Sequence, residues 1–300
     1  MEFLNEIFDN REKPISENSR KLYIHNLMKL NNNEPITNLN FLIDINSVLS
    51  KLSKYKPTTI RSYIIAICTV LKNNDEKLYN QYYEILSKMN NDLKVNTEKS
   101  EKQKENWMDS NDILDLFMKL KEEAKSKGRD RYDNILKYLI LALYVIQSPR
   151  RNIDYTLMRL SNDMTDSQYN YLDLVNRQFI FNNYKTAGKY NQVLVPIEDD
   201  LFKVIKLYLT VHPEKSKLKN KNYNIHFLIS KNGSPIDKSS NMTKIMNKIF
   251  GGKKIGSSLL RNIYLTNKYS GVMEQLNQDA SNMGTSVSTA MNQYIKTSNA

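Results

Sequence analysis

Cysteine is almost absent from this chain of 300 residues, which contains only Cys68. A single thiol can build neither a disulfide framework nor a cysteine metal site, and we expect a reducing compartment. Histidine is nearly as scarce, because His25, His212 and His226 stand far apart without neighbouring ligands. The sequence therefore predicts no metal centre.

Long apolar runs are missing as well. The longest run, Tyr138 to Ile146, is far shorter than the roughly 20 residues that span a bilayer. The start, Met1 to Asn10, is acidic and lacks the apolar core of a secretion signal. We expect a soluble intracellular protein without a membrane partner, and its exact compartment stays open.

Acidic residues are the minority among the charged ones. The chain has 44 Lys and Arg against 32 Asp and Glu, which gives a formal net charge of +12 at pH 7. Such an excess attracts polyanions and speeds their capture, so nucleic acid is the first partner to consider. A lysine-rich solvated surface has the same composition, and charge alone leaves both interpretations open.

The length and the hydrophobic pattern predict two domains. From Ser16 to about Lys94 the apolar residues recur at helical spacing, as Ile60, Ile64 and Ile67 do. After Val95 the sequence reads NTEKSEKQKEN without an apolar residue, which is typical of a linker. We expect a helical first domain over 1–98, a linker over 99–106 and a second domain over 107–300.

Basic residues cluster around one predicted helix start in the first domain. Pro57 and Thr58 suit the beginning of a helix. Backbone amides and positive side chains can hold a phosphate together at such a place. The candidate DNA contacts are Lys51, Lys54, Lys56 and Arg61. For any single lysine, a solvated charged face is the simpler explanation.

The second domain is predicted to be mainly α with a small antiparallel β-sheet, an α+β fold. Asp109 or Ser110 should cap a helix with an apolar stripe, and Ile135 to Ile146 should form a buried central helix that Pro149 ends. Strands are expected at 171–175, 178–182 and 192–197, with Gly188 in the last turn between them. Further helices are expected at 201–209, 239–250, 257–269, 273–277 and 286–295.

The sequence contains neither a phosphate-binding glycine loop nor a closely spaced pair of acids, which disfavours NTPases and metal-dependent nucleases. It does contain four segments that each carry an arginine, a lysine or a tyrosine. They read SPRRNIDY, NNYKTAGKYNQVLVPI, GSSLLRNIY and MGTSVSTAMNQY. In order and spacing these segments resemble the catalytic boxes of the tyrosine recombinase and phage-type integrase family, over roughly residues 107–296.

The first two segments resemble the first arginine box and the lysine hairpin of that family. The resemblance assigns Arg151 with Asp154, in preference to Arg150, because the family's acid follows its arginine by three residues. In the hairpin it favours Lys185 as the catalytic lysine. Lys189 remains the alternative, since hairpin length varies in the family.

The last two segments resemble the second arginine box and the tyrosine box. They assign Arg261 as the second arginine and Tyr294 as the nucleophile. The two positions at which the family has histidine or tryptophan are occupied by Ser258 and Thr285. A hydroxyl can donate one hydrogen bond in such a place, but it is a weaker partner than an imidazole.

The resemblance implies a site-specific DNA recombinase or integrase, of the kind that integrates viral genomes and mobile elements. It implies a helical core-binding domain and a catalytic domain that act on double-stranded DNA, with self-association into a tetramer in the synapse. The 3′-phosphotyrosyl intermediate stores the bond energy, so no cofactor is expected, neither ATP nor a metal. Two alternatives stay open: a type IB topoisomerase-like enzyme, and a DNA-binding relative that has lost catalysis.

Overall fold

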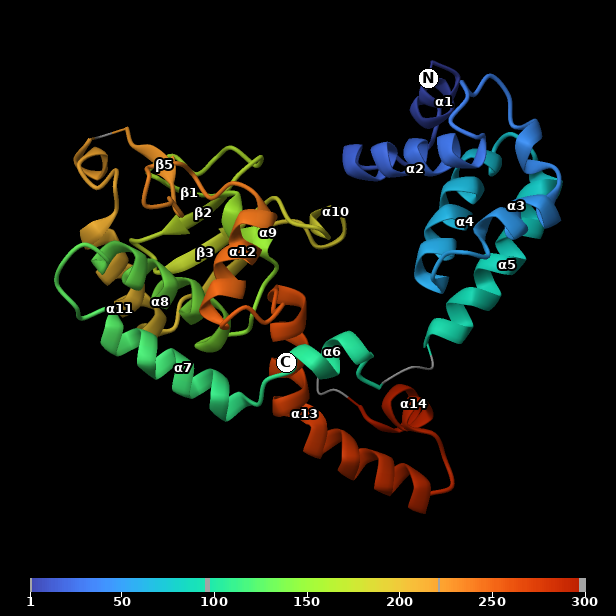
Figure 1. Ribbon diagram of the computed structural model, residues 1–300. Coiled ribbons are helices and arrows are strands. Elements are labelled where there is room, and N and C mark those ends of the chain that lie inside the picture. The colour runs from blue at the N-terminus through green and yellow to red at the C-terminus, as the bar shows by residue number, and fades with distance from the viewer. Residues whose placement is uncertain (1, 95–97, 221, 297–300) are drawn as a thin grey trace. The chain divides into compact units, whose positions relative to one another are not determined.

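The computed structural model describes residues 2–94, 98–220 and 222–296, and the chain divides into two compact units, Met1–Glu98 and Lys99–Ala300 (Figure 1). The first unit ends at Glu98, where the sequence pattern also ends its first domain. The predicted linker over 99–106 is corrected, because residues 101–106 form helix α6 (Glu101–Asn106) within the second unit. Ser100 and Gln103 make reciprocal capping hydrogen bonds, which stabilise a helix start without apolar residues.

The first unit is helical, as predicted. Its core forms around α4, in which Ile64, Ile67 and Leu71 are fully buried. Pro57 begins this helix, as the sequence indicated, since a proline at the first helical position loses no hydrogen bond. The helices are α1 (Glu2–Asp9), α2 (Glu17–Leu30), α3 (Ile45–Leu52), α4 (Pro57–Leu71) and α5 (Glu76–Lys94), with a short 3-10 turn at Asn40–Leu42.

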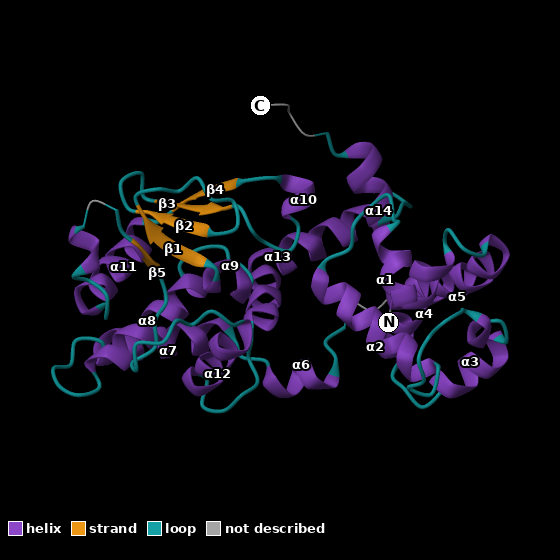
Figure 2. Ribbon diagram, turned by 90° about the horizontal axis from the view of Figure 1, so that it is seen from above, coloured by secondary structure: helices purple, strands orange, loops and turns teal. Residues whose placement is uncertain are grey.

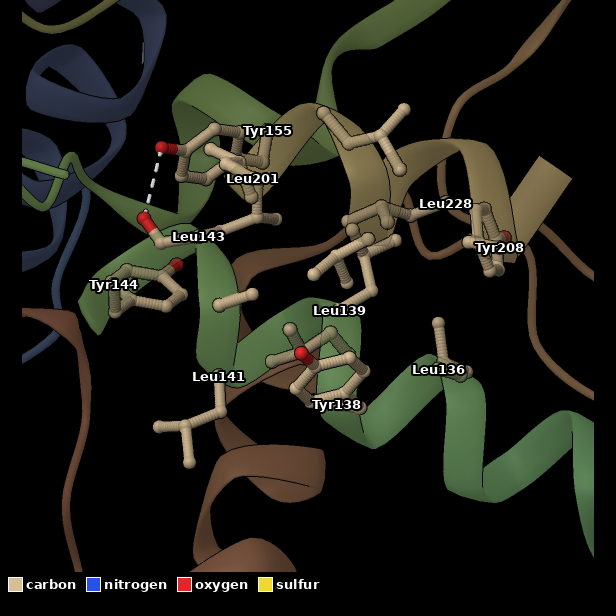
Figure 3. Packing of buried hydrophobic residues seen from close by; sticks show 14 of the residues in the cluster. Leu136, Tyr138, Leu139, Leu141, Leu143, Tyr144, Tyr155, Leu201, Tyr208 and Leu228 are labelled. Carbon is tan, nitrogen blue, oxygen red and sulfur yellow. Dashed lines mark hydrogen bonds between the residues drawn. The ribbon is translucent and has the colours of Figure 1, made fainter. Parts of the chain in front are cut away.

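The second unit is built around α8 (Arg131–Val145), which confirms the prediction of a buried central helix. Its residues pack against α7 (Ser110–Glu123), α11 (Asp199–Val211) and α12 (Ser239–Ile249). Figure 3 shows this core, where the hydroxyl of Tyr155 donates to the carbonyl oxygen of Leu143 over 3.3 Å. No helix in the described ranges is long and apolar enough to cross a membrane.

One five-stranded sheet completes the second unit, which makes the fold mainly α with a small sheet, as predicted. Its strands are β1 (Met158–Ser161), β2 (Asn170–Asp173), β3 (Gln178–Phe181), β4 (Val193–Pro196) and β5 (Asn224–His226), in the order β4-β3-β2-β1-β5. Figure 2 shows helices α7, α8 and α12 on one side of this sheet.

The predicted sheet had too few strands, and all of its strands were expected to be antiparallel. Strands β1 and β5 were not predicted, and β1 pairs with β2 in parallel, so the sheet is mixed rather than antiparallel. Both missed strands are short, and neither forms a hairpin with the strand next to it in the sequence. Their pairing also joins segments that are distant in the sequence, as Arg159 opposite His226 illustrates.

Three smaller predictions were also wrong. Gly188 lies inside a one-turn helix, α10 (Ala187–Tyr190), instead of a tight turn. The helices expected at 257–269 and 273–277 are one long helix, α13 (Ser257–Asn282), because Gly271 in an exposed helix costs only about 1 kcal/mol relative to alanine. The helix expected at 286–295 is divided between α14 (Val287–Thr289) and a π-helical turn, Ala290–Tyr294.

Candidate active site

Three arginines line one cavity of the second unit. The cavity has a volume of about 520 Å³, and Arg150, Arg151 and Arg261 all contribute to its wall. The first two come from the segment that leads into α9 (Asn152–Thr156), and Arg261 comes from the second turn of α13. The opposite wall is formed by the β3–β4 connection and β4. The structure thus brings together Arg151 and Arg261, which the sequence assigned to one site.

Arg150 is held in place by the protein itself. Its Nε donates to Oδ2 of Asp154 over 2.9 Å, and its guanidinium carbon lies 3.8 Å from the ring centre of Phe181. The carboxylate of Asp154 thus forms its ion pair with Arg150, four residues before it, whereas Arg151 acts on it through its charge. Burial raises the pKa of Asp154, and the positive charges of Arg150 and Arg151 oppose that rise.

Arg151 and Arg261 are different, because neither guanidinium donates a hydrogen bond to any group in the described part of the chain. Both side chains are partly buried, and Arg261 stands between the buried residues Leu260 and Ile263. Among the residues that the structure describes, the only acid lining the cavity is Asp154, which is paired with Arg150. The cavity therefore carries two positive charges without counter-ions.

A buried asparagine fixes the position of the arginine segment. Asn152 follows Arg151, and its Oδ1 accepts a hydrogen bond from the hydroxyl of Tyr144 over 2.6 Å. Its Nδ2 donates to Oγ1 of Thr243 over 3.0 Å, and its backbone N–H donates to Oγ of Ser257 over 3.3 Å. These contacts join α9 to α8, α12 and α13, so the helices that carry Arg151 and Arg261 are tied together.

A second buried asparagine joins α9 to the β3–β4 connection. Asn170 on β2 donates from Nδ2 to the carbonyl oxygens of Asp154 and Asn183, over 2.8 and 2.9 Å. Its Oδ1 accepts from the backbone N–H groups of Asn182 and Asn183, both over 2.8 Å. The side-chain amide of Asn170, with all of its hydrogen bonds made, therefore fixes the point at which the β3–β4 connection leaves the sheet.

Neither candidate lysine lines the cavity. Lys185 is exposed, although Tyr184 and Thr186 on either side of it do contribute to the wall. Lys189 is also exposed, and its Nζ lies 5.0 Å from the ring centre of Tyr190. The choice between the two lysines stays open.

The proposed nucleophile and the two histidine-position residues also lie apart from the cavity wall. Tyr294 is 56% exposed on the π-helical turn, which packs against α14. Ser258 is exposed in the first turn of α13, whereas the buried hydroxyl that contacts the arginine segment belongs to Ser257. Thr285 follows α13, and its backbone N–H donates to the carbonyl oxygen of Ala280 over 2.9 Å.

Sequence reasoning missed a tyrosine beside the cavity. The hydroxyl of Tyr264 lies 3.2 Å from Oγ of Ser148, which lines the cavity, and accepts a hydrogen bond from Nζ of Lys268 over 3.5 Å. The hydrogen bond with Ser148 and that with Lys268 lower the pKa of Tyr264, against the effect of burial. The sequence did offer one indication of this tyrosine. Tyr264 follows Arg261 by three residues, and residues i and i+3 lie on the same face of a helix.

In the first unit, the four candidate DNA contacts fall into two pairs. Lys51 donates from Nζ to the carbonyl oxygen of Leu30 over 3.2 Å, and Arg61 donates from Nε to Oδ1 of Asn90 over 2.6 Å. Lys54 and Lys56 are exposed, and Lys54 contacts only the ring of its neighbour Tyr55 among the groups described. Lys54 and Lys56 are thus the more available of the four for an external anion.

No protein-family model matches this chain, and no curated protein is significantly similar to it. The argument about function therefore depends on the chemistry of the cavity. Guanidinium groups remain charged at every relevant pH and bind the oxygens of a phosphate in pairs. Two unpaired guanidinium groups at one cavity are suited to bind a single phosphate group.

Proposed function

We propose that this protein cleaves and rejoins DNA strands as a site-specific recombinase or integrase, through a 3′-phosphotyrosyl intermediate. The observation that carries the proposal is that Arg151 and Arg261 face one cavity without counter-ions. Phosphoryl transfer requires mainly positioning and neutralisation of the charge on the non-bridging oxygens. Two bidentate cations meet that requirement at a single phosphodiester.

In this mechanism the scissile phosphate binds between Arg151 and Arg261, and the phenol of Tyr294 attacks the phosphorus. A phenol is a poor nucleophile at neutral pH, and nearby cations favour its anion. Because Tyr294 lies outside the cavity wall, cleavage requires the segment 283–294 to approach the arginines when DNA is bound. Double-stranded DNA is the proposed partner, with assembly into a tetramer at the synapse.

The net charge of +12 supports a polyanionic partner, and the exposed side chains of Lys54 and Lys56 supply a second place for phosphate contacts. A second candidate is a DNA-binding protein of the same architecture that does not cut. The position of Tyr294 outside the cavity favours this candidate, and the unpaired arginines are compatible with both.

A covalent-trapping experiment separates the two. The protein is incubated with duplexes that carry a nick next to each candidate phosphodiester, so that a cleaved strand diffuses away and the adduct accumulates. We expect a denaturant-stable protein–DNA adduct with the wild type and with Tyr83→Phe, an exposed tyrosine of the first unit. Tyr294→Phe should form no adduct and should bind DNA with unchanged affinity.

A wild-type protein that binds these duplexes without any adduct is the non-catalytic candidate. An adduct that persists in Tyr294→Phe places the nucleophile on another residue. Relaxation of supercoiled DNA without site preference and without joined products would indicate a topoisomerase-like activity in place of recombination.

A further inference from the structure

Three side chains form a hydrogen-bonded chain from the arginine cavity to solvent. Ser148 is exposed and lines the cavity, Tyr264 is partly buried, and Lys268 is exposed. The Ser148 and Tyr264 hydroxyl oxygens are 3.2 Å apart, and Lys268 Nζ lies 3.5 Å from the Tyr264 oxygen. Tyr264 and Lys268 are four residues apart on α13, and Tyr264 follows Arg261 by three, so all three share one face of the helix.

The proposed cleavage reaction needs a proton at this place. When the P–O bond breaks, the leaving 5′ oxygen would depart as an alkoxide unless an acid protonates it. The lysines that the sequence offered for this step, Lys185 and Lys189, are exposed and do not line the cavity. The hydroxyl of Ser148 does line it, but a serine hydroxyl is too weak an acid to act without a proton donor behind it.

Tyr264 and Lys268 are suited to supply that donor. A phenol has a reference pKa near 10, and its two hydrogen-bond partners lower the pKa of Tyr264 further. An ammonium group beside the phenol stabilises the phenolate that remains after proton transfer. Because Lys268 is exposed, the chain also has access to the protons of the solvent.

We propose that Ser148, Tyr264 and Lys268 form a proton relay that protonates the leaving 5′ oxygen, an inference that rests on the proposed strand-transfer function. Tyr294 attacks as its phenolate, with its proton released to water, and its oxygen bonds to phosphorus while the P–O5′ bond breaks. Ser148 gives its proton to the 5′ oxygen and takes the phenolic proton of Tyr264. The Tyr264 phenolate then stands beside the Lys268 ammonium. In the rejoining step the proton of the 5′ hydroxyl returns along the same path.

In this relay Ser148 is the catalytic residue, because it touches the leaving oxygen. Tyr264 and Lys268 are positioning residues that act through it. The hydroxyl of Tyr264 is engaged by partners on both sides, which suits a relay better than direct attack on phosphorus.

A substrate with sulfur in place of the bridging 5′ oxygen tests the relay, because a thiolate leaves without protonation. Single-turnover rates of adduct formation are measured on matched oxygen and sulfur duplexes. On the oxygen duplex, Ser148→Ala and Tyr264→Phe should each slow cleavage by about 10²- to 10⁴-fold, the usual contribution of general acid catalysis. On the sulfur duplex both variants should react within about threefold of the wild type. Tyr83→Phe should be unaffected on both.

Tyr264→Phe keeps the ring on α13, and an unchanged melting temperature verifies that the variant is folded. If the wild type forms adducts and Tyr264→Phe is equally fast on oxygen, the relay is wrong and the proposed function stands. If Tyr264→Phe is equally slow on both duplexes, Tyr264 is the nucleophile or a structural residue, and the relay is again wrong. If sulfur rescues Lys185→Ala instead, Lys185 is the acid. A wild type without adducts on either duplex removes the proposed function and the relay together.

Discussion

Arg150 donates a hydrogen bond from Nε to Oδ2 of Asp154 over 2.9 Å, and the side chain of Asp154 is only 2% exposed. The other carboxylate oxygen, Oδ1, is buried without a hydrogen-bond partner. Arg150 is therefore the principal compensation for a buried negative charge. Arg151, its neighbour in the sequence, has no such partner and faces the cavity. Two adjacent arginines thus have different surroundings, because Arg150 is paired with a buried carboxylate and Arg151 lines the cavity.

These surroundings predict unequal effects of two matched substitutions on the free energy of unfolding. Arg150→Met should lower the free energy of unfolding of the second unit by about 3 kcal/mol, because it leaves the Asp154 carboxylate buried and unpaired. Arg151→Met should lower it by clearly less, because Arg151 is partly buried but makes no hydrogen bond to Asp154 with its guanidinium and acts on that carboxylate through its charge. Urea unfolding of both variants and the wild type provides the comparison. Equal losses in the two variants would contradict this assignment.

Phosphate binding by the unpaired arginines predicts a change in salt dependence. The logarithm of DNA affinity falls linearly with the logarithm of salt concentration, with a slope set by the number of neutralised phosphates. Arg151→Ala and Arg261→Ala should each reduce that slope by about 1. Arg177→Ala removes an exposed arginine that already pairs with Asp199, and it should leave the slope unchanged. This slope is measured by fluorescence anisotropy of a labelled duplex at several salt concentrations.

The buried amide of Asn170 predicts a structural link between the arginine segment and the β3–β4 connection. Asn170→Leu keeps the branched shape of the side chain at Cγ but removes four hydrogen bonds, to Asp154, Asn182 and Asn183. Buried groups without partners cost about 1–3 kcal/mol each, so the loss in unfolding free energy should be at least about 3 kcal/mol. The same change at exposed Asn262 should have little effect. The urea midpoint of Asn170→Leu should be clearly lower than that of Asn262→Leu, and equal midpoints would contradict this role of Asn170.

A buried histidine predicts that the second unit loses stability in mild acid. The Nδ1 of His212 accepts from the backbone N–H of Glu214 over 3.1 Å, which leaves the proton on Nε2, 3.1 Å from the carbonyl oxygen of His226. Burial lowers the pKa of His212 below its ordinary value of 6.5. As pH falls below 6.5, the unfolded chain binds a proton that the folded chain does not.

The expected loss of stability is at most about 1.4 kcal/mol per pH unit, and it ends once the pH passes below the folded-state pKa. Burial also lowers the pKa of His226, which adds a loss of the same sign. Unfolding free energies at pH 7.5, 6.5 and 5.5 should fall less steeply for His212→Gln than for the wild type. Parallel pH profiles for the two proteins would refute this explanation.

The parts of the fold that the sequence predicted are those with strong local signals. The central helix α8 has apolar residues on nearly every side, and α4 begins at a proline, so neither needed tertiary information. Strands β1 and β5 lacked such a signal, because both are short and neither forms a hairpin with the strand next to it in the sequence. Helix α13 was expected as two helices, at 257–269 and 273–277, and Gly271, a poor helix former, lies between them.

The candidate site was partly accessible from the sequence. The ordered segments indicated Arg151 and Arg261, which the fold does bring to one cavity. The same segments could not show that neither Lys185 nor Tyr294 lines this cavity. Those positions depend on how the β3–β4 connection and the end of α13 pack, which is a property of the whole second unit.

By itself the sequence determined the charge of the protein, its helical character and the residue types available for chemistry, because these depend on composition and short-range pattern. Only the tertiary structure decided which groups are paired. Asp154 selects Arg150 because Phe181 on β3 offers that guanidinium an aromatic face and thereby leaves Arg151 unpaired. Tyr264 and Ser148 are 116 positions apart in the sequence. Their hydroxyl groups come into contact only because α13 packs beside the end of α8.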